Sequence, residues 1–248
     1  MTGVLIVTGG SRGIGRSVSI LAAARGHSVV VNYRNDDDAA AQTVKAIRDA
    51  GGIAEAIRGD VSKEDDIVEL FQQADRSLGP VTGLVNNAGI TGGDARMEDV
   101  QADQVVQTLV VNVAGPFLCC REAVRRMSTK YGGSGGAIVN ISSGAARLGS
   151  PGMRIHYAAS KGALDTMTIG LSKEVAGEGI RVNSVRAGIT DTEIHNFAEN
   201  PEKLAALSKV PPMGRVASAE EIAESVVWLL SPQASYVTGA VLDVGGGL

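Results

Sequence analysis

The chain has 248 residues, of which 44% are hydrophobic and 32 are glycine, and its net charge is −4. The apolar content excludes a disordered linker, no apolar run approaches the roughly 18 residues of a membrane span, and the acidic balance gives no electrostatic footprint for nucleic acid. Cys119 and Cys120 are adjacent, which predicts no disulfide framework, and no secretory signal opens the chain, so we expect a cytoplasmic protein.

Short apolar, β-branched runs alternate with longer segments of helical period. The runs predict strands at 4–7, 28–31, 53–57, 83–85, 137–141, 181–185 and 240–242. The amphipathic segments predict helices near 14–25, 38–50, 64–78, 101–130, 157–177 and 219–231. Such alternation is typical of right-handed βαβ units. The sequence therefore predicts an α/β fold in one domain, residues 1–248: a Rossmann-like doubly wound parallel sheet of seven strands with helices on both faces.

Two stretches do not fit this alternation, and one further segment breaks the composition. The long irregular stretches 144–156 and 187–215 are expected to be functional loops, because such loops are uncommon in compact domains. Within the second, 190–212 is expected to form a lid over the substrate, with Ile194, Phe197, Leu204 and Leu207 as its apolar residues. The glycine-rich segment 132–136 is expected to be a flexible connector.

A glycine-rich turn follows the first predicted strand. Its residues are Gly9, Ser11, Arg12, Gly13, Ile14 and Gly15. Backbone N–H groups of such a turn can approach a pyrophosphate, and the next helix adds roughly half a positive charge at its N-terminus. No Lys-Ser/Thr pair follows the glycines, so the turn is not a P-loop. We interpret it as the phosphate site for a dinucleotide.

Arg34 comes just after the second predicted strand, where dinucleotide folds contact the adenosine ribose. An acidic residue there binds the 2′-hydroxyl of NAD, whereas an arginine accommodates the 2′-phosphate of NADP. Arg34 and Arg12 together favour NADP(H), although both could instead be ordinary surface arginines. The aspartates at 36–38 are expected to begin the next helix.

Tyr157 and Lys161 are four residues apart on a predicted helix and therefore share one face. A phenol has a pKa of about 10, and a nearby ammonium group together with oxidised nicotinamide would move that pKa toward a useful value. The pair alone could equally be a helix-face contact without chemistry.

Further motifs complete a recognisable order along the chain. They are Thr8-Gly9-x₃-Gly13-x-Gly15, Asp60-Val61, Asn86-Asn87-Ala88-Gly89, Asn112, Ile141-Ser142-Ser143 and Tyr157-x₃-Lys161. In this order the chain resembles the short-chain dehydrogenases/reductases over essentially its whole length, down to residues 236–239.

The resemblance implies a catalytic tetrad. Tyr157 would protonate the substrate carbonyl oxygen while hydride leaves the nicotinamide, and Lys161 would lower the pKa of Tyr157 and bind the nicotinamide ribose. Ser143, rather than Ser142, would hold the carbonyl oxygen, although the 14 positions from Ser143 to Tyr157 exceed the usual gap by one. Asn112 would position a water that relays protons to Lys161, or it could simply be a buried polar residue at a helix kink.

The resemblance also implies cofactor contacts beyond the glycine turn. Asp60 and Val61 would contact adenine, and Asn87 would lie near the ribose beside Ala88 and Gly89, which leave room for the cofactor. The nicotinamide loop would include Gly188, Thr190 and Thr192. Ala187 replaces the usual proline before this loop, so we expect a looser turn there.

The sequence predicts an NADP(H)-dependent oxidoreductase that interconverts a carbonyl and an alcohol on a small molecule, as a homotetramer without a metal. Reduction of 3-oxoacyl thioesters and oxidation of sugars or polyols both fit the pattern. The alternatives are a non-catalytic dinucleotide-binding regulator, which would be expected to lack part of the tetrad, and a methyltransferase, which would not need Tyr157 and Lys161. Arg121, Arg125 and Arg126 are expected to form a solvated or subunit-contact strip.

Overall fold

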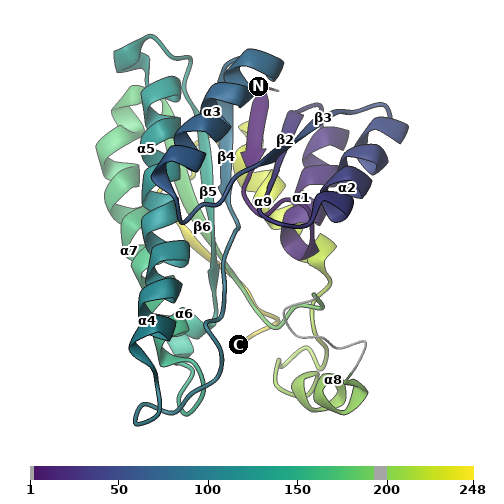
Figure 1. Cartoon of the computed structure of the whole chain (residues 1–248), viewed down its shortest axis with the longest axis vertical. Helices are drawn as coiled ribbons and strands as arrows, with labels where there is room; N and C mark the ends of the chain where they lie inside the picture. Colours follow the sequence, from purple (N-terminus) through teal and green to yellow (C-terminus); the bar gives the residue numbers. More distant parts are fainter. Residues whose placement is uncertain (1–2, 193–199) are drawn as a thin grey trace.

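The computed structural model describes residues 3–192 and 200–248, and its centre is a parallel sheet (Figure 1). The strands are β1 (Val4–Val7), β2 (Ser28–Tyr33), β3 (Ile53–Arg58), β4 (Val81–Asn86), β5 (Gly136–Ser143), β6 (Ile180–Ala187) and β7 (Val241–Val244). They lie in the order β3-β2-β1-β4-β5-β6-β7. The predicted fold class, a doubly wound parallel sheet of seven strands, is confirmed.

Helices connect the strands and cover both faces. They are α1 (Gly13–Ala24), α2 (Asp37–Asp49), α3 (Glu64–Leu78), α4 (Ala102–Leu109), α5 (Gly115–Met127), α6 (Ala145–Leu148), α7 (Ile155–Val175), α8 (Pro201–Leu207) and α9 (Ala219–Leu230). Short 3₁₀ turns cover Thr129–Tyr131, Ala176–Glu178 and Pro232–Ala234. None of the helices in the described ranges is long and apolar enough to cross a membrane.

The β-strand period of two divides the core between the two faces of the sheet. In β1, Leu5 and Val7 pack into one apolar cluster with α1, α2 and α9, whereas Val4 and Ile6 pack into another with α3, α5 and α7. Figure 1 shows the same division, with α1, α2 and α9 on one side of the sheet and α3, α5 and α7 on the other. Both faces are therefore covered by helices.

The strand order reverses between β1 and β4, because β2 and β3 extend the sheet one way from β1 while β4 to β7 extend it the other way. In open α/β sheets, ligands bind at the carboxyl ends of the strands beside such a switch point. The topology therefore places the glycine turn after β1 beside the Asn87 segment after β4.

Two helical features differ from the sequence prediction. The segment 101–130 is not one helix, because a π-helical turn, Val110–Ala114, separates α4 from α5. The short helices α6 and α8 occupy the stretches that were expected to be irregular. Such short helices lack the repeated apolar face from which longer ones are predicted. Of the expected lid residues, Ile194 and Phe197 lie outside the described residues.

The glycine-rich segment before β5 is not a flexible connector. A Cβ atom at Gly133 would lie 2.3 Å from the Arg126 carbonyl oxygen, and one at Gly136 would lie 2.3 Å from the Thr82 carbonyl oxygen. The Gly135 N–H also donates to the Met127 carbonyl over 2.7 Å. The prediction of a flexible connector is wrong, since these glycines allow close backbone packing.

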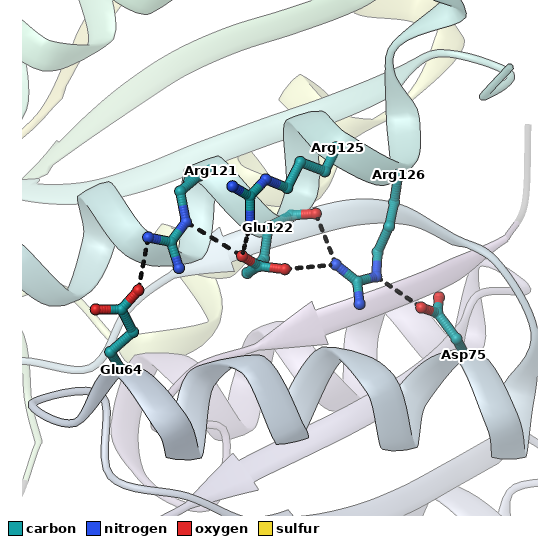
Figure 2. A network of polar contacts seen from close by, with 6 residues as sticks. All are labelled: Glu64, Asp75, Arg121, Glu122, Arg125 and Arg126. Atoms are coloured by element: carbon teal, nitrogen blue, oxygen red, sulfur yellow. Dashed lines mark hydrogen bonds and ion pairs between the residues drawn. The ribbon is translucent and has the colours of Figure 1, made fainter. Parts of the chain in front are cut away.

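The three arginines of α5 do not form a simple basic strip either, because they converge on Glu122, whose side chain is 5% exposed (Figure 2). Arg126 binds it over 2.9 Å and also bonds to Asp75 of α3 over 2.6 Å, while Arg121 reaches Glu64 of α3 over 2.8 Å. Burial opposes ionisation of Glu122, but the arginines hold its pKa below the usual value. This network joins α5 to α3.

Candidate active site

A cavity of about 410 Å³ lies at the carboxyl ends of the central strands. Twelve of the predicted cofactor residues line it: Gly9, Ser11, Arg12, Gly13, Ile14, Arg34, Asp60, Val61, Asn87, Ala88, Gly89 and Thr192. Motifs up to 183 residues apart in the chain thus meet in one place, as the topological argument requires.

The cavity also has walls that the motifs do not single out. These residues are Asn32, Tyr33, Asn35, Asp36, Gly59, Ile90 and Val111. Asn32 and Tyr33 end β2, Asn35 and Asp36 come soon after it, Gly59 follows β3 and Ile90 comes soon after β4. The rule that ligands bind at strand carboxyl ends could therefore have found them. Val111 lies in the π-helical turn and had no such signal.

The glycine turn has the form of a phosphate cradle. Helix α1 begins at Gly13. Among the described residues, no side chain caps its N-terminus, and its first turn contains no acidic residue. Its first N–H groups therefore remain available to an anion. The turn is braced by Asn87, whose side-chain amide donates to the carbonyls of Thr8 and Gly9, each over 3.0 Å. The residues present fit the pyrophosphate of a dinucleotide.

Five predicted cofactor residues, Tyr157 and Lys161 among them, do not line this cavity. The other three, Gly15, Gly188 and Thr190, have packing roles. A Cβ atom at Gly15 would lie 2.2 Å from the Gly9 carbonyl oxygen, and one at Gly188 would lie 2.6 Å from the Gly245 Cα. The Thr190 hydroxyl donates to the Gly188 carbonyl over 3.0 Å. These residues shape the turns that neighbour the cavity.

The adenosine end of the cavity carries both predicted cations. Arg12 lies 3.8 Å from Asp36, and Arg34 lies 4.0 Å from Asp60. Asp36 also caps α2 by accepting the N–H of Ala39, so the aspartates begin that helix as predicted. Burial opposes ionisation of Asp60, but hydrogen bonds from Ser62 hold its pKa below the usual value.

Both arginine side chains are more than half exposed, and their contacts with the aspartates are long. Exposed pairs of this kind are weak and can be exchanged for a stronger anionic partner. The two guanidinium groups are therefore free to turn toward a phosphate at this end.

Lys161 is buried at the far end of the site, and its Nζ donates to the Ile141 carbonyl over 2.7 Å. Gly89 leaves room beside it, since a Cβ atom there would lie 3.5 Å from Nζ and 3.2 Å from the Asn112 Oδ1. Burial lowers the pKa of Lys161 to about 8, and Asp165 opposes this shift. The lysine thus titrates near neutral pH, next to the cavity.

Tyr157 and Ser143 meet across α7 and β5. Burial raises the pKa of Tyr157, whereas a hydrogen bond with Ser143 and the charge of Arg154 act to lower it. The Lys161 Nζ lies 5.7 Å from the centre of the Tyr157 ring. In the free protein, burial therefore outweighs the groups that favour the phenolate, and the lowering of the Tyr157 pKa by Lys161 with oxidised nicotinamide stays a prediction.

Ser142 and Ser143 have different surroundings. The Ser142 hydroxyl is buried and donates to the Lys161 carbonyl over 3.2 Å, which joins β5 to α7. Ser143 instead faces Tyr157 and accepts the Ala145 N–H over 3.2 Å. The extra residue between Ser143 and Tyr157 falls in a stretch that contains α6 and Ser150, which has a φ of 49°.

Asn112 lies in the π-helical turn and is completely buried. Its Oδ1 accepts the Ile90 N–H over 2.9 Å, and its Nδ2 donates to the Ile90 carbonyl over 2.8 Å and to the Ser160 hydroxyl over 3.0 Å. The side chain therefore joins the segment after β4 to α7, and the predicted water relay stays a prediction.

Ala187 does not loosen the segment after β6. It is paired in the sheet with Ser143 of β5 and Val244 of β7, and its carbonyl accepts the Gly144 N–H over 3.0 Å. The sheet supplies the restraint that the expected proline would have given, so the prediction of a looser turn is wrong.

The chain matches known proteins along nearly its full length. A model of the family described as enoyl-(acyl carrier protein) reductase matches residues 9–248. The uncharacterized oxidoreductase YgfF of Escherichia coli K12 is 50% identical over 98% of this chain and 99% of its own length. The 3β-hydroxysteroid dehydrogenase 1 of Eggerthella lenta is 40% identical over 98% of this chain and 92% of its own.

A solved structure agrees as well. A blue fluorescent protein from a metagenomic library, in complex with NADPH, is 34% identical and has a TM-score of 0.91 over 99% of this chain and 97% of its own. The chain therefore belongs to the short-chain dehydrogenase/reductase family, whose members are oxidoreductases acting on carbonyl and alcohol groups. The predicted family, enzyme class and nicotinamide cofactor are confirmed, and the regulator and methyltransferase alternatives lose their support.

Proposed function

We propose that this enzyme reduces the carbonyl group of a small molecule with NADPH, and catalyses the reverse oxidation, using Tyr157, Lys161, Ser143 and Asn112. The observation that carries this proposal is the continuity of the site. The cavity that fits a dinucleotide reaches Gly89, which lies directly beside Lys161. Lys161 is on α7, the same helix that presents Tyr157 to Ser143.

Bound NADPH supplies the hydride, and this chain's residues manage the proton and the carbonyl oxygen. The Ser143 hydroxyl and the Tyr157 phenol hold that oxygen, and Tyr157 donates its proton as negative charge develops there. Lys161 holds the nicotinamide ribose and, when protonated, favours the phenolate that remains. Asn112 keeps the segment after β4 in place through its bonds to Ile90, and its proposed further role is to order the water that returns the proton.

NADPH rather than NADH is supported by the two arginines at the adenosine end. A 2′-phosphate would accept charge-assisted hydrogen bonds from Arg12 and Arg34, replacing their long contacts with Asp36 and Asp60.

Replacing Arg34 with methionine is expected to weaken NADPH binding by about 10- to 100-fold, because one charge-assisted bond to the phosphate is lost. NADH affinity should change by less than about twofold. Fluorescence titration of both cofactors measures the two dissociation constants. The control is Arg25→Met. Arg25 follows the C-terminal end of α1, away from the glycine turn, and its guanidinium is similarly exposed. Equal losses for both cofactors would contradict the phosphate role.

The substrate is a small carbonyl or alcohol compound, and 3-oxoacyl thioesters and sugars or polyols are the two candidate classes. NADPH consumption across a panel of ketones, acyl thioesters and sugars tests the proposed activity. Consumption with at least one class is expected. A protein that binds NADPH but oxidises it with none of these compounds would contradict the proposal.

We also propose that the enzyme is a homotetramer in the cytoplasm. The tetramer is supported by exposed apolar side chains: Val106 of α4 and Phe117 of α5 are about half exposed, and Tyr236 before β7 is fully exposed. Such exposed residues are typical of subunit contacts. Light scattering should give four times the 25.5 kDa mass of the chain, and a monomer at micromolar concentration would contradict it.

A further inference from the structure

The loop between β4 and α4, residues 87–101, is fastened to the start of the helix that carries Tyr157. The Ala95 N–H donates to the Met153 carbonyl over 2.7 Å. The His156 Nε2 lies 3.1 Å from the Thr91 carbonyl oxygen. These two contacts hold the loop against the first turn of α7.

A third contact is an ion pair between Asp94 of the loop and Arg154, the N-cap residue of α7. Arg154 makes no side-chain cap, and the described first turn of α7 contains no acidic residue. A cation at a helix N-terminus is unfavourable, whereas an anion there is favourable. Asp94 therefore supplies, from another part of the chain, the negative charge that this helix start lacks.

Arg154 is placed to act on the phenol. It is the N-cap residue and Tyr157 is the third residue of α7, so both lie in the first turn, on the side that an N-cap side chain faces, and the Arg154 side chain is only 19% exposed. The charge of Arg154 lowers the pKa of Tyr157, against the larger effect of burial.

Other polar groups near Tyr157 are already accounted for. Ser143 of β5 bonds to the phenol, and Lys161 lies on the same helix. Among the remaining charged groups on α7 and on the elements packed against it, Asp165 pairs with Arg186, and Arg147 of α6 pairs with Asp243 of β7. Asp103 of α4 accepts the Gln104 N–H, Arg181 of β6 donates to the Leu229 carbonyl, and Glu178 accepts the Ser128 hydroxyl. Lys173 and Glu174 lie at the opposite end of α7 from Tyr157.

We propose that Arg154, held by Asp94, is a positioning residue: the pair fixes the start of α7 against the loop 87–101 and keeps a positive charge beside the Tyr157 phenol. This inference rests on the proposed function. The charge favours the phenolate that forms when Tyr157 gives up its proton, and it acts before any cofactor binds.

The test is an ultraviolet difference titration of tyrosine ionisation in the full-length, cofactor-free protein, with Tyr157→Phe subtracted as the blank. Arg154→Met should raise the Tyr157 midpoint by about 1 pH unit, because a nearby positive charge is lost. Arg154→Lys keeps the positive charge, so its Tyr157 midpoint should lie close to that of the parent protein. Asp94→Asn keeps the cation but removes its counter-charge, so its midpoint should move down.

Arg96→Met is the matched control, since Arg96 lies in the same loop and pairs with Glu98 at the surface. Melting curves at each pH confirm that the variants are folded. Shifts of opposite sign in Arg154→Met and Asp94→Asn support the proposal, because loosening of the loop alone would move both midpoints in the same direction. An unchanged midpoint in Arg154→Met, or shifts of one sign in both variants, would overturn it.

The titration needs no substrate and no turnover. If the parent protein transfers no hydride, the proposed function fails while the midpoints still decide the role of Arg154. If hydride transfer is found and the midpoints do not move, the inference fails alone.

Discussion

Tyr157→Phe is expected to lower kcat by about 100- to 10,000-fold, because the variant lacks the proton donor that general acid catalysis requires. NADPH affinity should change by less than about twofold, since the ring remains and only the hydroxyl is lost. Steady-state kinetics with the best substrate of the panel, together with a cofactor titration, separates the two effects.

Tyr131→Phe serves as the control for this change. Tyr131 is 61% exposed, in the 3₁₀ turn before β5, so losing its hydroxyl should leave kcat at the parent value. Turnover by Tyr157→Phe at a rate close to that of the parent would remove Tyr157 from the mechanism.

Lys161→Met is expected to have the second largest effect. It removes the only charge of that side chain while keeping a similar length, so bonds to the nicotinamide ribose and support for the phenolate are both lost. NADPH affinity should fall about 10- to 100-fold, the cost of a charge-assisted hydrogen bond, and kcat should fall as well. Lys173→Met, an exposed change on the same helix, should alter neither.

The pKa of Lys161 also predicts the direction in which NADPH affinity changes with pH. Burial lowers the pKa of Lys161 to about 8, so the free protein loses the lysine charge as pH rises through that value. NADPH affinity of the parent should therefore decline above about pH 8, while that of Lys161→Met should be weak and flat over the same range. Parallel pH curves for the two proteins would show that Lys161 does not hold the cofactor.

The sequence predicted the sheet well, because strands buried on both faces are continuous apolar runs. β1 was predicted to the residue, and the ends of the other strands differ from the prediction by at most two positions. The π-helical turn was not predicted as such: only an interruption at Asn112 was, since an extra residue per turn leaves no distinct apolar period.

Some features of the candidate site were likewise predictable from the sequence and others were not. The glycine turn and the residues after β4 were predictable, because they are local motifs at strand ends. The partners of Asn112, and the pairing of Asp94 with Arg154, were not, because they join side chains that are far apart in the chain. The roles of individual glycines also needed the structure: Gly133 and Gly188 allow close backbone packing, whereas Gly89 leaves room beside Lys161.

The most direct test of the proposed activity follows the hydride itself. NADPH carrying deuterium in place of the transferred hydrogen is incubated with the parent protein and each carbonyl compound of the panel. The mass and amount of the alcohol product are then measured by mass spectrometry. One deuterium on the former carbonyl carbon is expected with the parent, and at least 100-fold less product with Tyr157→Phe, about the lower bound for general acid catalysis. Binding of NADPH with no labelled alcohol from any compound would contradict the account.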